Sequence, residues 1–433
     1  MKYYSLNNNS KEVSFLDAVK KGLAPDGGLY FPKNTPFLSK DLIKNIKSFS
    51  NHEIAFKAIE TFVGDDIPSE RLKKIIEETL SFDFPIIPIT NSISSLELFH
   101  GPTLAFKDIG ARFMARCLAY ANEIQETEKL TILVATSGDT GGAIADSFYD
   151  VEGINVVILY PKEKVSPIQE KQLTTFGKNI TALEVNGTFD DCQDMVKSAF
   201  IDSEITKKQA LTSANSINIA RWLAQMFYFF IAFKERPNPD KKLAVSVPSG
   251  NFGNLCAGLM AKEMGLPIDH FIASTNINNT VPNYLETGIY SVKKSKATLS
   301  NAMDVGEPSN FIRIQKIFNN DFYKIKKSIS GSYFNDSETK KAIKEIFNNN
   351  KYITDPHGAI GYLGLKSFLN STEEKFSGIF LGTAHPIKFA NTVEKTLKIK
   401  IDVPERLKSI LDLNKKSIQI ENYDQLKSFL LDH

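Results

Sequence analysis

The sequence predicts an α/β protein built on open, mostly parallel β-sheets. Three times a short apolar run is followed by a turn rich in Gly, Ser, Thr or Asn and then by a helical segment. "TILVA" precedes "TSGDTGG", "LAVSV" precedes "PSGNFGN", and "SGIFL" precedes "GTAHP". "NVVILY" and "ITALEV" have the pattern of further strands. In such sheets ligands bind beyond the carboxyl ends of the strands, which is where these turns are expected.

The region before the first of these strands is predicted to be mainly helical. "VSFLDAVKKGL" and "NHEIAFKAIETFV" place apolar residues three and four positions apart, the spacing of one helix face. Between them, "APDGGLYFP" indicates a loop with a short strand, and the turn-rich "DFPIIPITNS" indicates a boundary.

Composition narrows the class of protein. The chain has 433 residues, 42% hydrophobic and 24% charged, and a net charge of +2, so it is expected to be a soluble globular protein with no nucleic-acid footprint. The apolar stretch "WLAQMFYFFIAF" is too short to cross a bilayer and predicts one buried helix. The three cysteines are widely spaced and the N-terminus lacks a signal-peptide pattern. We therefore expect a cytoplasmic protein with no metal site and no membrane partner.

The turn "PSGNFGN" has the features of an anion-binding loop. Gly250 and Gly253 let main-chain N–H groups approach a ligand, and the positive end of a helix expected to begin near Leu255 points there. The segment between Pro248 and Cys256 contains no acidic residue that would repel a phosphate. An ordinary glycine-rich turn is the alternative, because short glycine motifs are weak signals.

The turn "TSGDTGG" has a different chemistry, because it contains Asp139. The hydroxyls of Thr136, Ser137 and Thr140, with N–H groups before a helix expected at Gly142, suit a substrate carboxylate or a hydroxylated ring. Neither turn matches the P-loop or the dinucleotide fingerprint, so a nucleoside triphosphatase is not expected.

A third polar cluster lies in "TSANSINIARWLAQMF". If the helix begins after a cap at Asn215 or Ser216, then Asn218, Arg221 and Gln225 form one stripe along it. This stripe is either a solvated face or the lining of an interior cleft. In a cleft, Arg221 would suit a phosphate, since its planar fork binds oxyanions in a bidentate manner.

Lys107 in "HGPTLAFKDIGARFM" is the candidate nucleophile. It shares its side of a predicted helix with Gly110, Ala111 and Met114. The helix dipole and burial should both lower its pKa, and a neutral amine is what imine formation with an aldehyde requires. An ordinary surface lysine is the alternative. Together with an anion loop and a hydroxyl-rich loop, such a lysine matches the needs of pyridoxal phosphate.

Five motifs in this order, "HGPTLAFKD", "ATSGDTG", "SANSINIAR", "VPSGNFGN" and "GTAHPIKF", resemble those of the threonine synthase family of pyridoxal-phosphate enzymes. The opening "VSFLDAVKKGLAPDGGLYFP" resembles the longer bacterial and fungal form. The resemblance implies the tryptophan synthase β-like fold (fold type II), with two open sheet domains and the active site between them. We expect a mainly helical N-terminal domain at 1–90, a large α/β cofactor domain at 91–124 and 211–433, and a small α/β domain at 125–210.

The resemblance also implies roles for individual residues. Lys107 would hold the cofactor as a Schiff base and move protons at the substrate, and Thr383 would place its hydroxyl at the pyridine nitrogen. The remaining cofactor contacts would come from Gly250, Asn251, Phe252, Gly253, Asn254 and Asp139. Many related enzymes have asparagine in place of Asp139, so this acid either contacts the cofactor's phenolic oxygen or orders its loop. Substrate would be bound by Thr136, Ser137, Gly138, Thr140, Asn215, Ser216, Arg221 and Asn251.

The implied reaction converts O-phospho-L-homoserine and water to L-threonine and phosphate by γ-elimination and water addition. Alternatives on the same fold are a phospho-lyase that yields 2-oxobutyrate from that substrate and a serine/threonine dehydratase. A catalytically silent ligand-binding protein is a further alternative, against which Lys107 argues. His385 is either a general base or, as histidines more often are, structural. The expected partner is the small-molecule substrate alone, and the expected state is a monomer or homodimer.

Overall fold

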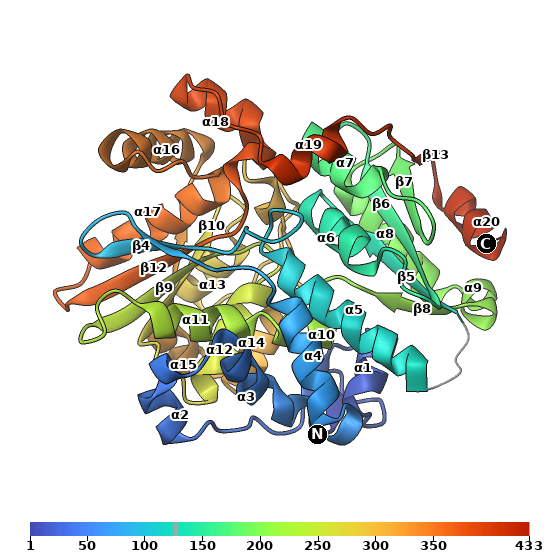
Figure 1. Ribbon diagram of the computed structural model, residues 1–433, viewed down its shortest axis with the longest axis horizontal. Helices are drawn as coiled ribbons and strands as arrows, with labels where there is room; N and C mark the ends of the chain where they lie inside the picture. The colour runs from blue at the N-terminus through green and yellow to red at the C-terminus, as the bar shows by residue number, and fades with distance from the viewer. Residues whose placement is uncertain (125–128, 433) are drawn as a thin grey trace. The chain divides into compact units, whose positions relative to one another are not determined.

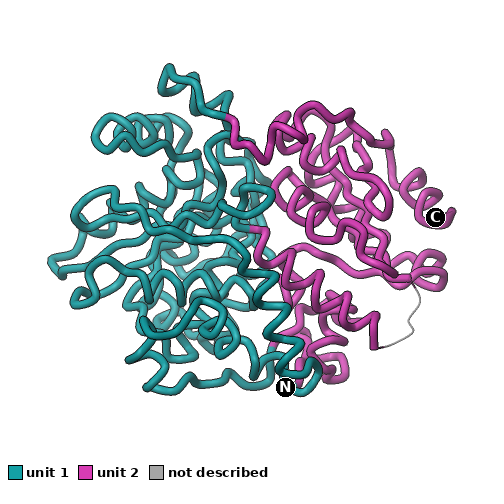
Figure 2. The backbone as a smooth tube through the Cα atoms, viewed as in Figure 1, with its two compact units in different colours: residues 1, 32–106, 222–402 teal, residues 2–31, 107–221, 403–433 magenta. Residues whose placement is uncertain are grey.

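The computed structural model describes residues 1–124 and 129–432. The chain divides into two compact units, coloured separately in Figure 2. Unit 1 comprises residue 1, residues 32–106 and residues 222–402, and unit 2 comprises residues 2–31, 107–221 and 403–433. One boundary falls between Phe106 and Lys107, and another between Arg221 and Trp222. The units differ in extent from the three domains expected from the sequence, whose boundaries stay a prediction.

Unit 1 contains a six-stranded sheet with the order β11-β10-β9-β12-β4-β3. Its strands are β3 (Ile86–Pro88), β4 (Ile93–Glu97), β9 (Lys242–Pro248), β10 (His270–Thr275), β11 (Ile329–Tyr333) and β12 (Phe376–Gly382). All neighbours are parallel except β3 and β4. The strands predicted at "LAVSV" and "SGIFL" are therefore confirmed, and they lie side by side as β9 and β12. Their carboxyl ends place the two turns that follow them at the same edge of the sheet.

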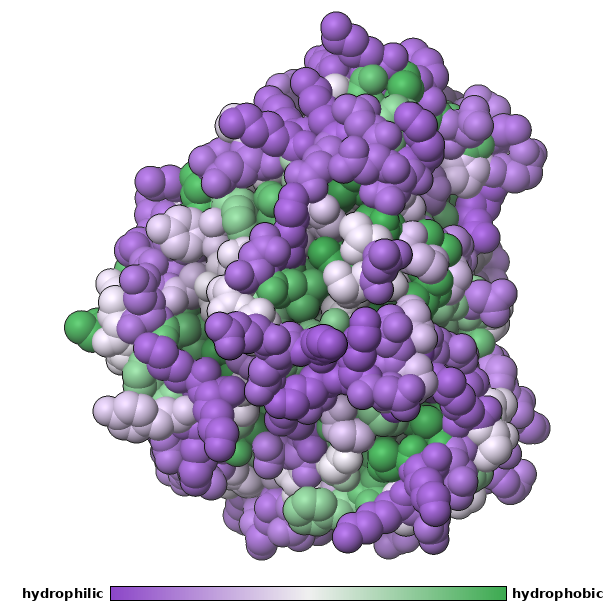
Figure 3. Space-filling model, turned by 90° about the vertical axis from the view of Figure 1, so that its left-hand side faces the viewer, coloured by the Kyte–Doolittle hydropathy of each residue, from purple (hydrophilic) through white to green (hydrophobic). Residues whose placement is uncertain are grey.

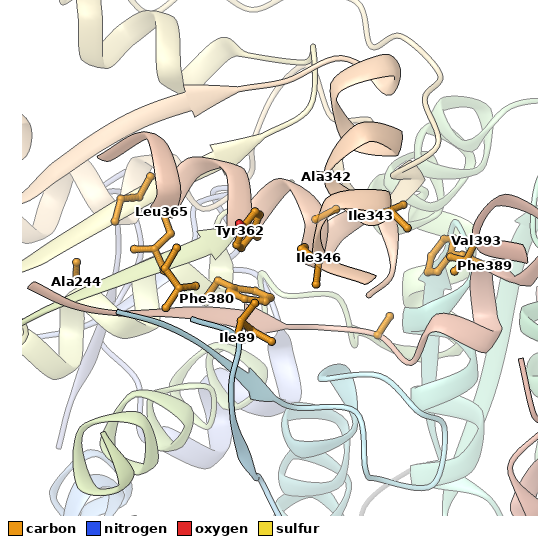
Figure 4. Close-up of a cluster of buried hydrophobic side chains, with 14 of the residues drawn as sticks. Ile89, Ala244, Ala342, Ile343, Ile346, Tyr362, Leu365, Phe380, Phe389 and Val393 are labelled. Atoms are coloured by element: carbon orange, nitrogen blue, oxygen red, sulfur yellow. The ribbon is translucent and has the colours of Figure 1, made fainter. Parts of the chain in front are cut away.

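Helices cover this sheet, and a close-up of the packing is shown in Figure 4. Helix α17 (Pro356–Asn370) lies along β12 with Tyr362 and Leu365 directed at Phe380, and the rings of Tyr362 and Phe380 meet edge to face at 6.1 Å. The other helical elements of unit 1 are α2 (Lys40–Lys44), η1 (Ile46–Ser48), α3 (Asn51–Val63), η2 (Gly64–Asp66), α4 (Ser69–Thr79), α11 (Met226–Glu235), α12 (Gly253–Glu263), α13 (Thr280–Thr287), η3 (Asn301–Met303), α14 (Phe311–Ile317), α15 (Phe322–Ser328), α16 (Asp336–Asn350), η4 (Pro386–Phe389) and α18 (Ala390–Leu397). Figure 1 shows their course.

Unit 2 contains a five-stranded, wholly parallel sheet with the order β13-β7-β6-β5-β8. Its strands are β5 (Leu130–Ala135), β6 (Ile154–Pro161), β7 (Ile180–Val185), β8 (Ala210–Ser213) and β13 (Ile418–Ile420). Its helices are α1 (Phe15–Lys21), α5 (Lys107–Ile124), α6 (Asp139–Phe148), α7 (Pro167–Thr174), α8 (Phe189–Ile201), α9 (Ser203–Lys208), α19 (Glu405–Leu411) and α20 (Tyr423–Asp432). Side chains alternate across the sheet. Leu159 and Leu183 pack with Val196 of α8, whereas Tyr160 and Ala182 pack with Leu173 of α7.

The N-terminal segment forms the helices that its periodicity predicts. Helix α3 spans the predicted segment Asn51–Val63, and a capping box of Ser50 and Glu53 fixes its start. The short strand predicted within "APDGGLYFP" is β2 (Tyr30–Pro32), which pairs with β1 (Tyr3–Ser5) in a two-stranded sheet.

The apolar run from 222 to 233 is not the single helix predicted from its sequence. Helix α10 (Ile219–Leu223) ends before Gln225, and α11 begins at Met226. Nor does the helix begin after Asn215 or Ser216. The Asn218 carboxamide accepts the Ala220 N–H at 3.1 Å and donates to the Ser213 carbonyl at 3.1 Å, so this side chain caps the helix two residues later. The expected polar stripe is interior, because Asn218, Arg221 and Gln225 are all buried.

No helix among the described residues is long and apolar enough to cross a membrane. The face of the molecule in Figure 3 is mainly hydrophilic, with hydrophobic residues in small separate groups. Such a mosaic is ordinary for a protein surface exposed to water.

Candidate active site

The anion-binding loop of unit 1 joins β9 to α12. Helix α12 begins at Gly253, two residues earlier than predicted, and its N-cap Phe252 has a left-handed backbone with φ 60°. The main-chain N–H groups of residues 250–254 donate to no acceptor within the described parts of the chain. A left-handed residue beside a helix start is typical of main-chain anion sites, so these N–H groups are suited to hold a phosphate, and we name residues 250–254 the anion nest.

Contacts behind this loop hold its shape. The Asn254 side chain donates to the Pro248 carbonyl at 2.9 Å and accepts the Ser249 hydroxyl at 2.9 Å, which closes the loop on itself. A Cβ at Gly250 would lie 2.3 Å from the Ala302 carbonyl oxygen, so only glycine fits there. The side chain of Asn254 is therefore committed to the loop, and its main chain is the part available to a ligand.

Thr383 lies in the same unit, directly after β12. Its side chain is buried, and its hydroxyl makes no hydrogen bond within the chain as described. Its carbonyl accepts the Phe106 N–H at 2.9 Å. Phe106 is the residue immediately before Lys107, so this hydrogen bond anchors the chain next to the candidate nucleophile.

His385 has the contacts of a structural residue. Its Nδ1 accepts the Ile387 N–H at 3.2 Å, which caps η4, and its ring meets Phe99 edge to face. Burial lowers the pKa of His385 to about 4. A histidine whose Nδ1 is an acceptor and whose charged form is disfavoured suits the structural interpretation better than the general-base one.

The hydroxyl-rich loop of unit 2 joins β5 to α6. The Thr136 hydroxyl accepts the N–H groups of Gly138 at 3.0 Å and Gly141 at 2.9 Å, so part of the loop's donor capacity is used internally. Helix α6 begins at Asp139 and not at Gly142 as predicted, which puts the acid in the first helical turn. An acidic side chain is favourable at that position because it faces the positive end of the helix dipole.

Asp139 is buried and accepts a hydrogen bond from a residue outside the predicted site. Gln169 Nε2, at the start of α7, donates to Asp139 Oδ1 at 2.9 Å. Gln169 also forms a capping box with Ser166, which the sequence pattern could have indicated. Its contact with Asp139, thirty residues away, has no local signal. This contact favours the role of Asp139 in ordering its loop.

Lys107 is the first residue of α5 and is half-buried. Its Nζ donates to the Thr140 hydroxyl at 2.8 Å, which brings two predicted site residues together. One turn further, a Cβ at Gly110 would lie 2.9 Å from the Arg221 carbonyl oxygen and 3.0 Å from its Nε. The small residue beside Lys107 is thus explained by the close approach of Arg221, another predicted site residue.

The segment before α10 supplies the remaining predicted groups of unit 2. The buried Arg221 guanidinium donates to the Ala214 carbonyl, which fixes its orientation. Asn215 Nδ2 donates to the Ala135 carbonyl at 3.4 Å, at the end of β5, while its Oδ1 is buried and has no hydrogen-bond partner in the described chain. Ser137 and Ser216 are half-buried.

These residues fit pyridoxal phosphate. Its phosphate needs several hydrogen-bond donors, which the open N–H groups of residues 250–254 provide, and the loop itself contains no acidic residue. Its aldehyde needs an accessible amine, and its ring needs groups that tune the nitrogen, for which Lys107 and the open hydroxyl of Thr383 are suited.

Comparisons with known proteins agree with this chemistry. Residues 2–80 match the family model "Threonine synthase N terminus", residues 95–377 match "Pyridoxal-phosphate dependent enzyme", and residues 358–430 match "Threonine synthase, C-terminal". The chain is 45% identical over 435 aligned positions to threonine synthase of Buchnera aphidicola subsp. Baizongia pistaciae, covering 100% of both chains.

Solved structures give the same result. The crystal structure of threonine synthase from Escherichia coli matches with a TM-score of 0.93 and 42% identity, covering 100% of both chains. A structure of PLP-bound threonine synthase from Brucella melitensis matches with a TM-score of 0.92 and 32% identity, covering 100% of this chain and 99% of that one. The chain belongs to the threonine synthase family of pyridoxal-phosphate-dependent enzymes.

Proposed function

We propose that this protein converts O-phospho-L-homoserine and water to L-threonine and inorganic phosphate, using pyridoxal phosphate. The observation that carries the proposal is the match to threonine synthases along the whole chain. It is supported by Lys107, whose amine lies 2.8 Å from the hydroxyl of Thr140 in a turn suited to an amino-acid carboxylate.

The bound cofactor supplies an electron-withdrawing ring that acidifies the carbon atoms of the substrate attached to it. Lys107 would hold its aldehyde carbon, and residues 250–254 would hold its phosphate through main-chain N–H groups. Thr383 would donate or accept a hydrogen bond at the ring nitrogen. A neutral hydroxyl does not hold that nitrogen protonated as a carboxylate would, so Thr383 moderates the ring and restrains competing reactions.

Lys107 would also be the base that moves protons between substrate carbon atoms. A hydroxyl 2.8 Å from its Nζ limits where the amine can point. We assign Thr140 this orienting role in addition to substrate binding. Asp139, held by Gln169, would keep the turn that carries Thr140 in a fixed conformation.

The two anionic groups of the substrate would be bound by different elements. The turn 137–140 would accept the carboxylate on its N–H groups and hydroxyls. Arg221 would bind the leaving phosphate and stabilise the charge that develops on it, with Ser216, Thr136, Asn215 and Asn251 as further donors.

The decisive experiment is to incubate the purified enzyme with O-phospho-L-homoserine and identify the products by NMR, with phosphate release measured in parallel. Equal amounts of threonine and phosphate are expected. 2-Oxobutyrate in place of threonine would replace this proposal with the phospho-lyase. L-Serine and L-threonine are the control substrates, and rapid release of keto acid from them would indicate a dehydratase.

We further propose that the enzyme acts as a monomer or homodimer on this small molecule alone, without nucleic acid or membrane. Its three cysteines are buried free thiols, which agrees with a reducing compartment such as the cytoplasm. Sedimentation at several concentrations tests the oligomeric state, and cell fractionation tests the compartment.

A further inference from the structure

Behind the anion nest of unit 1 lies a completely buried arginine to which the proposed mechanism gives no role. Arg313 is on α14 and is 0% exposed. Its NH1 donates to the Asn310 side-chain oxygen at 2.7 Å. The main-chain N–H of Asn310 in turn donates to the carbonyl of Asn251, inside the loop, at 3.1 Å. Two hydrogen bonds therefore join the guanidinium to the loop.

Arg313 also lies beside the first turn of α12, the helix that begins in this loop. The Cys256 thiol, three residues after Gly253, is an electrostatic neighbour of the guanidinium. On another side the guanidinium lies over the Trp222 ring at 4.5 Å, a cation–π contact that fixes its plane. Burial lowers the pKa of Arg313 to about 10, so the group stays charged at neutral pH.

The loop is therefore connected to two positive charges of different origin. The N-terminus of α12 has a partial positive charge from its unpaired N–H groups, and Arg313 adds a full one in a dry environment. Like charges at close range oppose each other, more strongly in a protein interior than in water. A dianion bound to the N–H groups of residues 250–254 is attracted by both charges and offsets their mutual repulsion.

We propose that Arg313 is a positioning residue for the cofactor's phosphate, supplying buried positive charge and holding the loop through Asn310. The proposal rests on the proposed function only in that the cofactor carries a phosphate. It predicts that Arg313 raises affinity for the phosphate group specifically and not for the pyridoxal ring.

The test compares apoenzyme binding of pyridoxal phosphate with binding of pyridoxal, which has the same ring and aldehyde but no phosphate. Arg313→Gln should weaken binding of pyridoxal phosphate about 10-fold to 100-fold, by analogy with the loss of residues that position metal ligands, and should change binding of pyridoxal little. Arg313→Lys, which keeps the charge, should restore most of the preference. Inorganic phosphate should raise the unfolding temperature of the wild-type apoenzyme and raise that of Arg313→Gln less.

Arg236→Gln is the matched control. Arg236 also stacks on an aromatic ring, that of Phe233, and donates to a main-chain carbonyl, but its electrostatic neighbours are Asp240 and Asp269. Its loss should leave the preference for pyridoxal phosphate over pyridoxal unchanged. An equal fall in affinity for both compounds in Arg313→Gln would overturn the proposal and leave Arg313 a packing residue.

A second variant decides the matter if Arg313→Gln does not fold. Asn310→Asp has nearly the same shape, and its carboxylate would pair with Arg313 and cancel the charge. Asn310→Asp should lower the preference for pyridoxal phosphate over pyridoxal at least as much as Arg313→Gln does. An unchanged preference in Asn310→Asp would contradict the proposal. A wild-type enzyme that binds pyridoxal phosphate but forms no threonine would instead refute the proposed function and leave this inference standing.

Discussion

The two loops that follow β9 and β5 begin from the same strand–turn–helix pattern and differ in what they leave available to a ligand. After β9, the five N–H groups of residues 250–254 have no acceptor in the described chain, the loop contains no acidic residue, and the buried Arg313 is hydrogen-bonded to it through Asn310. After β5, the Thr136 hydroxyl takes up two N–H groups, and a buried Asp139 is tied to Gln169. The lesson is that a glycine-rich turn becomes an anion site only through the donors it leaves unused.

The largest effect is expected from Lys107→Ala, which removes the amine that contacts Thr140 in the loop after β5. Without the amine, turnover should fall at least about 10³-fold, because both attachment of the cofactor and proton movement are lost. Borohydride reduction of the wild-type holoenzyme followed by peptide mapping should label Lys107. The exposed Lys164→Ala is the control, and label on another lysine would contradict the assignment.

The next effect tests the β9 loop through Gly250→Ala. The added Cβ would approach the Ala302 carbonyl oxygen to 2.3 Å, so the loop must move. The free energy of unfolding should fall by about 1–3 kcal/mol, and affinity for pyridoxal phosphate should fall with it. Gly177→Ala is the control, because its added Cβ would lie 3.6 Å from the Lys416 Nζ, an ordinary van der Waals distance that requires no movement. Wild-type cofactor affinity in Gly250→Ala would mean that this loop does not bind the phosphate.

Gln169→Ala tests whether the contact with Asp139 keeps the loop after β5 in its binding conformation. It removes a hydrogen bond to the buried Asp139 carboxylate, which is worth about 1.5–3 kcal/mol. We expect KM for O-phospho-L-homoserine to rise about 10-fold while affinity for pyridoxal phosphate stays near wild type. Steady-state kinetics and cofactor titration measure the two quantities.

Gln169→Glu separates the contact with Asp139 from the capping of α7. Glutamate keeps the capping box with Ser166 but places a second carboxylate against Asp139. KM should therefore rise in this variant as well. A rise confined to Gln169→Ala would assign the effect to the cap.

The smallest effect concerns His385. Because its pKa in the folded enzyme is about 4, below the usual 6.5, the unfolded chain binds more protons between these values, and stability falls as pH decreases from about 6.5. His385→Gln should remove this contribution. Between pH 7 and pH 5, wild type should lose about 1–2 kcal/mol of unfolding free energy relative to the variant.

Other titrating groups change the pH dependence of the unfolding free energy, but they contribute equally to wild type and to His385→Gln and so cancel in the difference between the two. His270, with a pKa of about 4, acts in the same direction, whereas Asp304, whose pKa is raised by burial to about 6, stabilises the fold as pH falls below 6. Urea unfolding at each pH gives the free energies. A 100-fold fall in kcat at neutral pH in His385→Gln would indicate a general base instead.

The prediction from sequence was accurate where the signal is local. Helix α3 and strand β7 coincide with the segments their periodicity indicates, because a continuous apolar face is specified by neighbouring residues. The single helix predicted across 222–233 was wrong for the converse reason. Between α10 and α11 the Gln225 N–H donates to the Trp222 carbonyl and the Phe227 N–H to the Ala224 carbonyl, both at 3.2 Å. These three-residue hydrogen bonds interrupt the α-helix, and the pattern of apolar residues does not encode them.

The fold class and the family could be read from residue types in short, ordered motifs, and the comparisons confirm both. The roles of Lys107 and of the two loops rest on the same motifs and stay predictions. The residues that contact those motifs from distant segments are seen only in the tertiary structure. Gln169 binds Asp139, Arg221 packs on Gly110, and Arg313 is joined through Asn310 to the anion nest. These pairings are contacts between segments brought together by the sheets, and a spacing along the chain carries no record of them.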